Sequence, residues 1–265
     1  MALQAKTSSP SPISQTGRRL PLLYSNPVVL RFEEHAKWGI KPAEDFRFAA
    51  AVNAVPLAIG EFMPALRNYP IVFADGEMPS PVALLGIRQG QNLHADKDGV
   101  WRAGAYLPAY LRRYPFILTE TADKSTRALC IDLASDRFVD AGEHKDCRLF
   151  NDDGSAAPIA REILGFCEAW HQEQVQGAEF VRALKDADLL VPQGVTFSFP
   201  DGGTYNLGGY RIVDRDRLRQ LAAETLKDWN ERGWLSPIAL HLASLHNWQL
   251  LHQLAGEEIR KEDER

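Results

Sequence analysis

The sequence predicts an α+β fold in which a strand-rich, largely antiparallel N-terminal part is followed by a helix-rich C-terminal part. Three observations support this prediction. Short β-like runs separated by turn residues fill the chain before about residue 155. From Pro158 onward, apolar residues recur at helical spacing, interrupted by one hairpin pattern. Two similar segments in the first part predict a repeated short helix–strand unit.

The first part contains short apolar runs that we interpret as strands. They lie at residues 46–48, 71–73, 82–87, 116–118 and 128–132. Two short helices are expected between them, at residues 61–68 and 109–114. Because the runs are short and only some are separated by helices, a mostly antiparallel sheet fits better than a regular βαβ series.

The repeat joins PALRNYPIVF at residues 64–73 to PAYLRRYPFIL at residues 108–118, with one inserted residue. Since the residue before a proline is pushed out of the helical region, each copy is predicted as a short helix that ends at Tyr-Pro and leads into a core strand. A functional alternative places both copies around one groove, where arginine forks hold a carboxylate or phosphate. The residues concerned are Arg67, Tyr69, Arg112, Arg113 and Tyr114.

The helical period of the second part predicts a helix from Pro158 to about Asp186. Residues 195–199 and 205–213 alternate at period two around a Pro-Asp-Gly-Gly turn and predict a hairpin. A helix over residues 217–231 follows, capped by Asp214 or Asp216 and stopped at Gly233. The last helix is predicted from Ser236, as N-cap, to about residue 254.

These patterns divide the chain into four expected regions. Residues 1–20, rich in Ser, Pro, Thr and Gln, are predicted to be a disordered tail. Residues 21–154 form the strand-rich subdomain, and residues 155–256 form a helix-rich subdomain packed on the first. Residues 257–265 are a charged tail, which is either a solvated helix end or a frayed end.

Composition and charge exclude several classes of protein. The 30 Lys and Arg residues against 35 Asp and Glu give a net charge of −5, which argues against binding to nucleic acid. The longest weakly polar stretches are too short for integral membrane association. The first 23 residues lack the order of a secretory signal, so we expect a cytoplasmic protein. Three cysteines without CxxC spacing predict free thiols that are buried or partly buried.

Few residues form a pattern that indicates catalysis, so neither a catalytic residue nor a cofactor is predicted. His94 and Asp96 have the spacing of an iron site, with His144 or His171 as a distant ligand, although residues 96–99 also suit a plain turn. The densest aromatic and cationic stretch holds Trp101, Arg102 and Tyr106. It is either a binding surface or a set of core aromatics with arginines reaching to solvent.

Several motifs together resemble the bacterial SapC family, which is distinct from the permease of the same name. The likeness covers roughly residues 25–252. The motifs that carry it are NAVPL at 53–57, YPIVF at 69–73, PVALLG at 81–86, QNL at 91–93, GVWRAGAY at 99–106, RYPFIL at 113–118, GGYRIVD at 208–214, and GWL from 233 with HLASL at 241–245.

The resemblance implies a link to a surface-array (S-layer) locus and an accessory role in nutrient uptake or modification, with no established catalytic residues to carry over. The leading hypothesis is therefore a non-catalytic binding or accessory protein, whose partner is a small acidic metabolite or another protein. Its candidate ligand-binding residues are Arg67, Tyr69, Trp101, Arg102, Tyr106, Arg113 and Tyr114. The alternatives are an iron-dependent oxygenase-like enzyme using His94 and Asp96, and a structural surface-layer component. A homo-oligomer stays open.

Overall fold

The computed structural model describes residues 20–120, 126–142, 145–200 and 203–264. It has the predicted α+β architecture, and each strand pair in the described residues is antiparallel. The predicted disordered tail, apart from residue 20, lies outside the described residues. The charged C-terminal tail continues a helix as far as Asp263, in agreement with the helix-end interpretation.

The chain forms two compact units, and neither is a continuous stretch of sequence. Unit 1 contains the described residues up to Ala43 together with Arg113–Ala169, whereas unit 2 contains Glu44–Arg112 and Trp170–Arg265. The sequence-based boundary between residues 154 and 155 falls inside unit 1. The long helix α4 (Pro158–Asp186) begins in unit 1 and ends in unit 2, and its two ends match the predicted ones.

Unit 1 is built on a three-stranded sheet and a separate two-stranded ribbon. The sheet has the order β1 (Pro27–Val29), β7 (Arg127–Asp132), β6 (Phe116–Glu120), and the ribbon pairs β2 (Trp38–Ile40) with β8 (Phe138–Asp140). Helix α1 (Phe32–His35) and the first turns of α4 complete it. Val28, Phe116 and Ile131 bury the core against Ala160 and Cys167 of α4.

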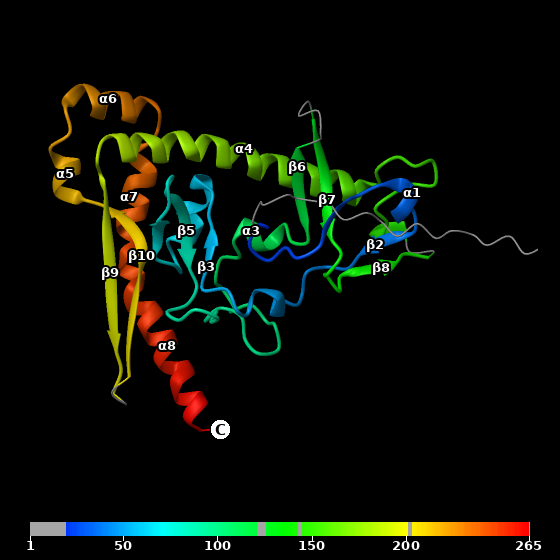
Figure 1. The fold of residues 1–265 in the computed structure, drawn as a ribbon, viewed down its shortest axis with the longest axis horizontal. Helices are drawn as coiled ribbons and strands as arrows, with labels where there is room; N and C mark the ends of the chain where they lie inside the picture. Colours follow the sequence, from blue (N-terminus) through cyan, green and yellow to red (C-terminus); the bar gives the residue numbers. More distant parts are fainter. Residues whose placement is uncertain (1–19, 121–125, 143–144, 201–202, 265) are drawn as a thin grey trace, which may run out of the picture. The chain divides into compact units, whose positions relative to one another are not determined.

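Unit 2 is larger and centres on a five-stranded sheet. Its order is β3 (Ala54–Pro56), β5 (Ser80–Leu84), β4 (Ile71–Ala74), β10 (Thr204–Val213), β9 (Leu190–Ser198). Its helices are α2 (Phe62–Ala65), α3 (Ala109–Arg112), α5 (Arg215–Arg219), α6 (Ala223–Glu231), α7 (Leu235–Ser244) and α8 (Trp248–Asp263). In Figure 1, β9 and β10 form the long predicted hairpin, and α7 and α8 follow it. Phe197 and Tyr210 of this hairpin bury their rings against Leu251 of α8.

The same three-stranded pattern occurs once in each unit. In unit 1 the first strand, β1, pairs with β7, which pairs with the preceding β6; in unit 2, β3 pairs with β5, which pairs with β4. The first strand of each hairpin, β6 in unit 1 and β4 in unit 2, is preceded by a four-residue helix and a Tyr-Pro pair. The repeated helix–strand unit predicted from the sequence is therefore confirmed, and it extends to a further strand on each side.

The two copies also share their backbone hydrogen bonds. Three bonds of unit 1 have a counterpart of similar length in unit 2, and each joins the equivalent pair of strands. They are Leu133 N to Asn26 O (3.0 Å) with Leu85 N to Asn53 O (2.7 Å), Asp132 N to Pro115 O (2.9 Å) with Leu84 N to Pro70 O (3.1 Å), and Leu30 N to Leu129 O (2.9 Å) with Leu57 N to Pro81 O (3.0 Å).

Three local predictions are wrong. Residues 46–48 are not a strand, because Asp45 Oδ1 accepts the Arg47 N–H at 2.8 Å and starts a 3₁₀ turn over Arg47–Ala49. The helix expected over residues 217–231 is interrupted between α5 and α6, at a place without glycine or proline. The last helix starts at Leu235 instead of after Ser236, and a 3₁₀ turn at Leu245–Asn247 divides it. Asp214 does cap α5, accepting the N–H groups of Asp216 and Arg217.

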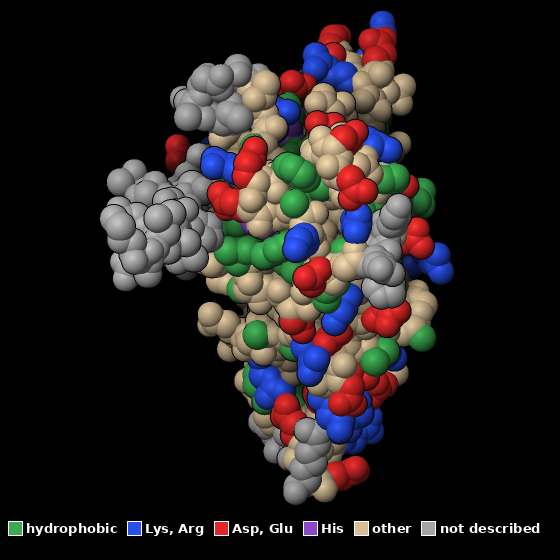
Figure 2. All heavy atoms as spheres, turned by 90° about the vertical axis from the view of Figure 1, so that its right-hand side faces the viewer, with side chains coloured by type: hydrophobic (Ala, Val, Ile, Leu, Met, Phe, Trp, Pro, Cys, Tyr) green, Lys and Arg blue, Asp and Glu red, His purple; other side chains and the backbone are tan. Residues whose placement is uncertain are grey.

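The surface carries charges of both signs. On the face drawn in Figure 2, acidic and basic side chains are interspersed with hydrophobic ones. Within the described part of the chain, none of the helices has the length and apolarity needed to cross a membrane. The three cysteines are free, with Cys130 and Cys167 buried and Cys147 partly buried, as the sequence predicted.

Candidate functional site

A pocket with a volume of about 820 Å³ lies in unit 2. The segment from Arg88 to Ala103 supplies most of its lining, and Ala50 and three residues near the end of α8 supply the rest. Two of the predicted binding residues, Trp101 and Arg102, belong to this lining, together with His94. We therefore take it as the candidate site and call it the His94 pocket.

A buried aromatic cluster forms one side of the His94 pocket. The ring of His94 lies edge-on to Tyr69 with centroids 4.7 Å apart, and it stacks on Trp101 at 6.1 Å. Phe46 also packs against Trp101, with ring centroids 5.7 Å apart. His94 is 2% exposed and Tyr69 is fully buried, whereas Trp101 is partly exposed. The segment after β5 therefore carries a polar ring into the interior of unit 2.

Three nitrogen atoms in this cluster have no hydrogen-bond partner: Nδ1 and Nε2 of His94, and Nε1 of Trp101. The indole N–H of Trp101 lies close enough to the Tyr69 hydroxyl to lower the pKa of Tyr69, but the contact does not have hydrogen-bond geometry. Burial has the larger effect and raises the pKa of Tyr69. Burial, reinforced by the nearby charge of Arg102, lowers the pKa of His94 to about 4. His94 is therefore neutral at neutral pH. Each buried group without a partner costs about 1–3 kcal/mol.

A polar network fastens the loop behind this cluster. The Tyr106 hydroxyl and the Ala109 N–H donate to Glu61 Oε1 at 2.9 and 2.6 Å, and Tyr69 donates its hydroxyl to the Tyr106 carbonyl. Burial, followed by the charge of Glu61, raises the pKa of Tyr106 to about 12. The Tyr106 N–H donates to Asn68 Oδ1 at 3.0 Å. Tyr69 and Tyr106, both predicted as binding residues, are brought together, and they hold the loop in place.

The tip of the pocket loop is a turn, as one of the two sequence interpretations of residues 96–99 expected. Asp96 Oδ1 accepts the N–H groups of Asp98 and Val100 at 2.9 and 2.8 Å. This leaves Asp96 on the exposed tip while His94 is buried. Among the residues that the structure describes, no group of three His, Cys, Asp or Glu side chains is placed to hold a metal ion. His144, one expected distant ligand, lies outside the described residues.

The charged groups of the His94 pocket are partly paired with α8. Arg88 donates to Glu262 Oε1 at 3.0 Å, and Arg102 lies 3.8 Å from Glu257 Oε2. The second pair is long, and both of its side chains are partly exposed, so it contributes little to stability. Arg102 is thus a cation of the pocket that is only weakly paired, with Glu257.

The remaining predicted residues lie elsewhere. Arg67 is exposed in unit 2, whereas Arg113 and Tyr114 belong to unit 1. There the Arg113 guanidinium lies 5.7 Å from the centroid of the Tyr24 ring, and Tyr114 meets the same ring edge-on at 5.5 Å. Neither unit by itself contains both arginines, so the groove shared by the two repeat copies stays a prediction.

Sequence reasoning missed the residues that position the site. Glu61 is buried and accepts three hydrogen bonds, from Ala58, Tyr106 and Ala109, and no motif around it marks this role. For His94, the sequence motif suggests only a role as metal ligand. Its burial follows from packing against Tyr69, a residue 25 positions earlier in the sequence, and this contact leaves no local signal.

Comparison with known proteins agrees with the motif evidence. The family model described as SapC matches residues 30–251 of the 265-residue chain. No curated protein and no solved structure matches the chain.

Proposed function

The chain belongs to the SapC family, and we propose that it is a non-catalytic binding protein. Its sequence motifs indicate no catalytic residues. In this proposal the His94 pocket holds a small ligand with a carboxylate group. One observation carries the proposal. Three buried nitrogens, on His94 and Trp101, have no partner beside a pocket of about 820 Å³. Buried polar groups without partners are uncommon in folded proteins, and a bound ligand is one explanation for them.

The hydrogen-bond donors and acceptors of these side chains indicate the chemical class of the ligand. The Trp101 indole is only a donor, and neutral His94 offers one donor and one acceptor. Arg102 adds a cation that is loosely paired with Glu257. Among these three side chains donors therefore exceed acceptors, which suits a carboxylate with its two acceptor oxygens better than an amine.

The partly exposed Trp101 gives the ligand a route to the buried nitrogens. The ring of His94 lies beneath Trp101, so a ligand entering the pocket meets the indole and Arg102 first. A shift of the Trp101 ring then admits a ligand oxygen to the His94 ring. Each nitrogen that gains a partner recovers about 1–3 kcal/mol, which offsets the cost of ordering the ligand.

A thermal-shift experiment on the full chain tests the proposal with succinate and citrate as probes, against sodium chloride and inorganic phosphate at equal ionic strength. We expect at least one carboxylate to raise the Tm by about 2–4 °C. Arg102→Gln should abolish the shift. Arg219→Gln, which removes an exposed arginine paired with Asp216 on α5, should retain it.

Two outcomes contradict this function. The first is the absence of any shift with both carboxylates. The second is a shift of the same size with phosphate or in Arg102→Gln, because either result indicates a general effect of anions. The wider link to surface-layer, nutrient-uptake or modification systems belongs to the same proposal, and pull-down with products of neighbouring genes tests it.

A further inference from the structure

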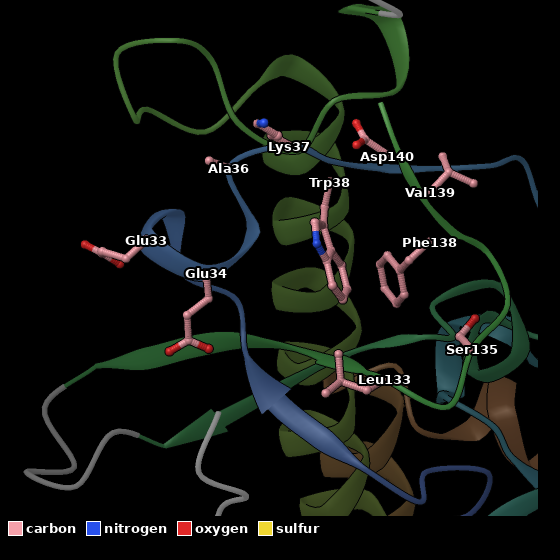
Figure 3. A pocket seen from close by; sticks show the side chains of 10 residues that line it. All are labelled: Glu33, Glu34, Ala36, Lys37, Trp38, Leu133, Ser135, Phe138, Val139 and Asp140. Atoms are coloured by element: carbon pink, nitrogen blue, oxygen red, sulfur yellow. The ribbon is translucent and has the colours of Figure 1, made fainter. Parts of the chain in front are cut away.

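Unit 1 contains a second pocket, of about 670 Å³, that the proposed function does not use. It lies where α1, the ribbon of β2 and β8, and the residues after β7 meet. Its lining, drawn in Figure 3, consists of Glu33, Glu34, Ala36, Lys37, Trp38, Leu133, Ser135, Phe138, Val139 and Asp140. The volume falls within the ~300–1,000 Å³ that is usual for small-molecule sites. We call it the Trp38 pocket.

Two aromatic rings project into the Trp38 pocket. Trp38 of β2 and Phe138 of β8 are diagonal neighbours on one face of the ribbon, because Trp38 pairs with Asp140 and Ile40 pairs with Phe138. Their centroids are 5.4 Å apart at an angle of 41°. Figure 3 shows both rings extending toward Leu133. Both remain partly exposed, although burying them fully would stabilise the fold more.

The Trp38 ring is held in place from behind. His35 lies edge-on to it, with centroids 4.7 Å apart and an interplanar angle of 82°. His35 is itself buried, and its Nδ1 lies within hydrogen-bond distance of the Arg31 backbone at 3.0–3.1 Å. The aromatic wall is therefore formed before any ligand arrives, which reduces the cost of binding.

The charges around the rings favour a cation. Three carboxylates (Glu33, Glu34 and Asp140) line the pocket against one ammonium, that of Lys37. In Figure 3, Glu34 lies to one side of the two rings with its carboxylate directed away from Trp38, whereas Lys37 and Asp140 lie at the end opposite Leu133. Among the described residues, the cation paired with Glu34 is Arg31 at 3.9 Å, and both side chains are exposed, so this pair is weak and the carboxylate remains available.

From these features we propose that the Trp38 pocket binds a small organic cation through an ammonium group. The faces of Trp and Phe attract cations through their ring quadrupoles, and Trp does so most strongly. The carboxylate of Glu34 supplies the countercharge. A neutral ligand of the same shape gains the apolar contact with Leu133 and the rings, but neither of these electrostatic contributions. This site lies wholly within unit 1 and does not depend on the His94 pocket.

Calorimetric titration of the full chain with choline tests this site. The comparison ligand is its neutral carbon isostere, which carries a tert-butyl group in place of the trimethylammonium group. We expect choline to bind about tenfold more tightly than the isostere. Glu34→Gln should weaken choline binding about two- to fivefold. The matched control Glu120→Gln, an exposed carboxylate of β6 outside the pocket, should leave binding unchanged.

Trp38→Leu keeps an apolar side chain and removes the ring face, so it should weaken choline binding about tenfold. Because this change also removes packing against His35 and Phe138, circular dichroism checks that the variant folds. If it does not fold, Glu34→Gln carries the test alone from an exposed position. Equal affinity for choline and its isostere, no binding of choline, or full affinity in Glu34→Gln would each overturn the proposal.

Discussion

Units 1 and 2 share one three-stranded pattern but differ in what they bury at its centre. Asp132 of β7 and Leu84 of β5 occupy equivalent positions, since each N–H donates to the carbonyl of the proline that precedes the neighbouring strand, Pro115 before β6 and Pro70 before β4. Asp132 is fully buried, and its carboxylate accepts the N–H groups of Ser25 and Asn26 at 2.9 and 2.8 Å. Leu84 packs in the apolar core instead.

The two pockets also differ in the chemical character of the side chains that line them. The Trp38 pocket of unit 1 joins partly exposed aromatic rings to an excess of carboxylates, whereas the His94 pocket of unit 2 joins buried nitrogens without partners to a loosely paired arginine. The shared backbone pattern therefore sets the scaffold only. The segments attached around it, α1 with the β2–β8 ribbon in unit 1 and the loop after β5 in unit 2, decide the chemistry.

Placing the residue of unit 2 in unit 1 should break the comparison most severely. Asp132→Leu leaves the N–H groups of Ser25 and Asn26 without their acceptor, so we expect the free energy of unfolding to fall by about 3–5 kcal/mol. Urea denaturation followed by circular dichroism measures the change. Asp132→Asn keeps one acceptor oxygen and should cost less. A loss below about 1 kcal/mol in Asp132→Leu would mean that this carboxylate does not hold β1 to β7.

The second largest effect is expected from acidification, because two buried histidines make the stability of unit 2 depend on pH. Burial is the main cause that lowers the pKa of both His94 and His241, two residues of unit 2, to about 4 from 6.5. Because their unfolded forms take up protons first, stability is complete above pH 6.5 and falls as the pH drops toward 4. The loss is on the order of 3 kcal/mol for each histidine.

The contribution of His94 to this loss is measured by comparing urea unfolding of the wild type and His94→Phe across that pH range. The variant should lose less stability on acidification than the wild type. Parallel pH profiles for the two proteins would show that His94 does not carry the effect.

The smallest expected effect compares the two buried histidines at neutral pH. His94→Phe removes two nitrogens without partners, so it should leave stability unchanged or raise it by about 1 kcal/mol. His241 Nε2 accepts the Val213 N–H at 3.0 Å, and Nδ1 lies 2.7 Å from the Ile71 carbonyl. His241→Phe should therefore cost about 1–3 kcal/mol. Equal losses in both variants, measured by urea denaturation, would contradict the assignment of the His94 nitrogens.

Much of the fold could be predicted because its signals are local. The ends of α4 follow from its long helical period, and β4 and β6 follow from the Tyr-Pro repeat. Strands β1, β2, β3 and β8 were missed because three residues are too few to show an alternating pattern. The division into units was not predicted, since it depends on pairings such as Val28 with Ile131, more than a hundred residues apart.

The candidate sites were less predictable than the fold, because they depend on pairings between residues far apart in the sequence. Trp101 and Arg102 were found from composition, and both line the His94 pocket. Trp38 and Phe138 gave no signal, because a hundred residues separate them and only the pairing of β2 with β8 brings their rings together. A pocket that depends on distant pairings cannot be recognised from spacing along the chain.

The interleaved course of the chain has a consequence during synthesis. It passes between the units three times, after residues 43, 112 and 169. As the nascent chain leaves the ribosome, β1 emerges about a hundred residues before its partner β7, and the whole of the smaller segment of unit 2 emerges between them. The first strand must therefore stay unpaired while the intervening chain is made, which favours slow assembly and a need for protection of that strand. A fragment ending at Arg112 would contain β1 without β6 and β7, so neither unit can be produced by a single truncation.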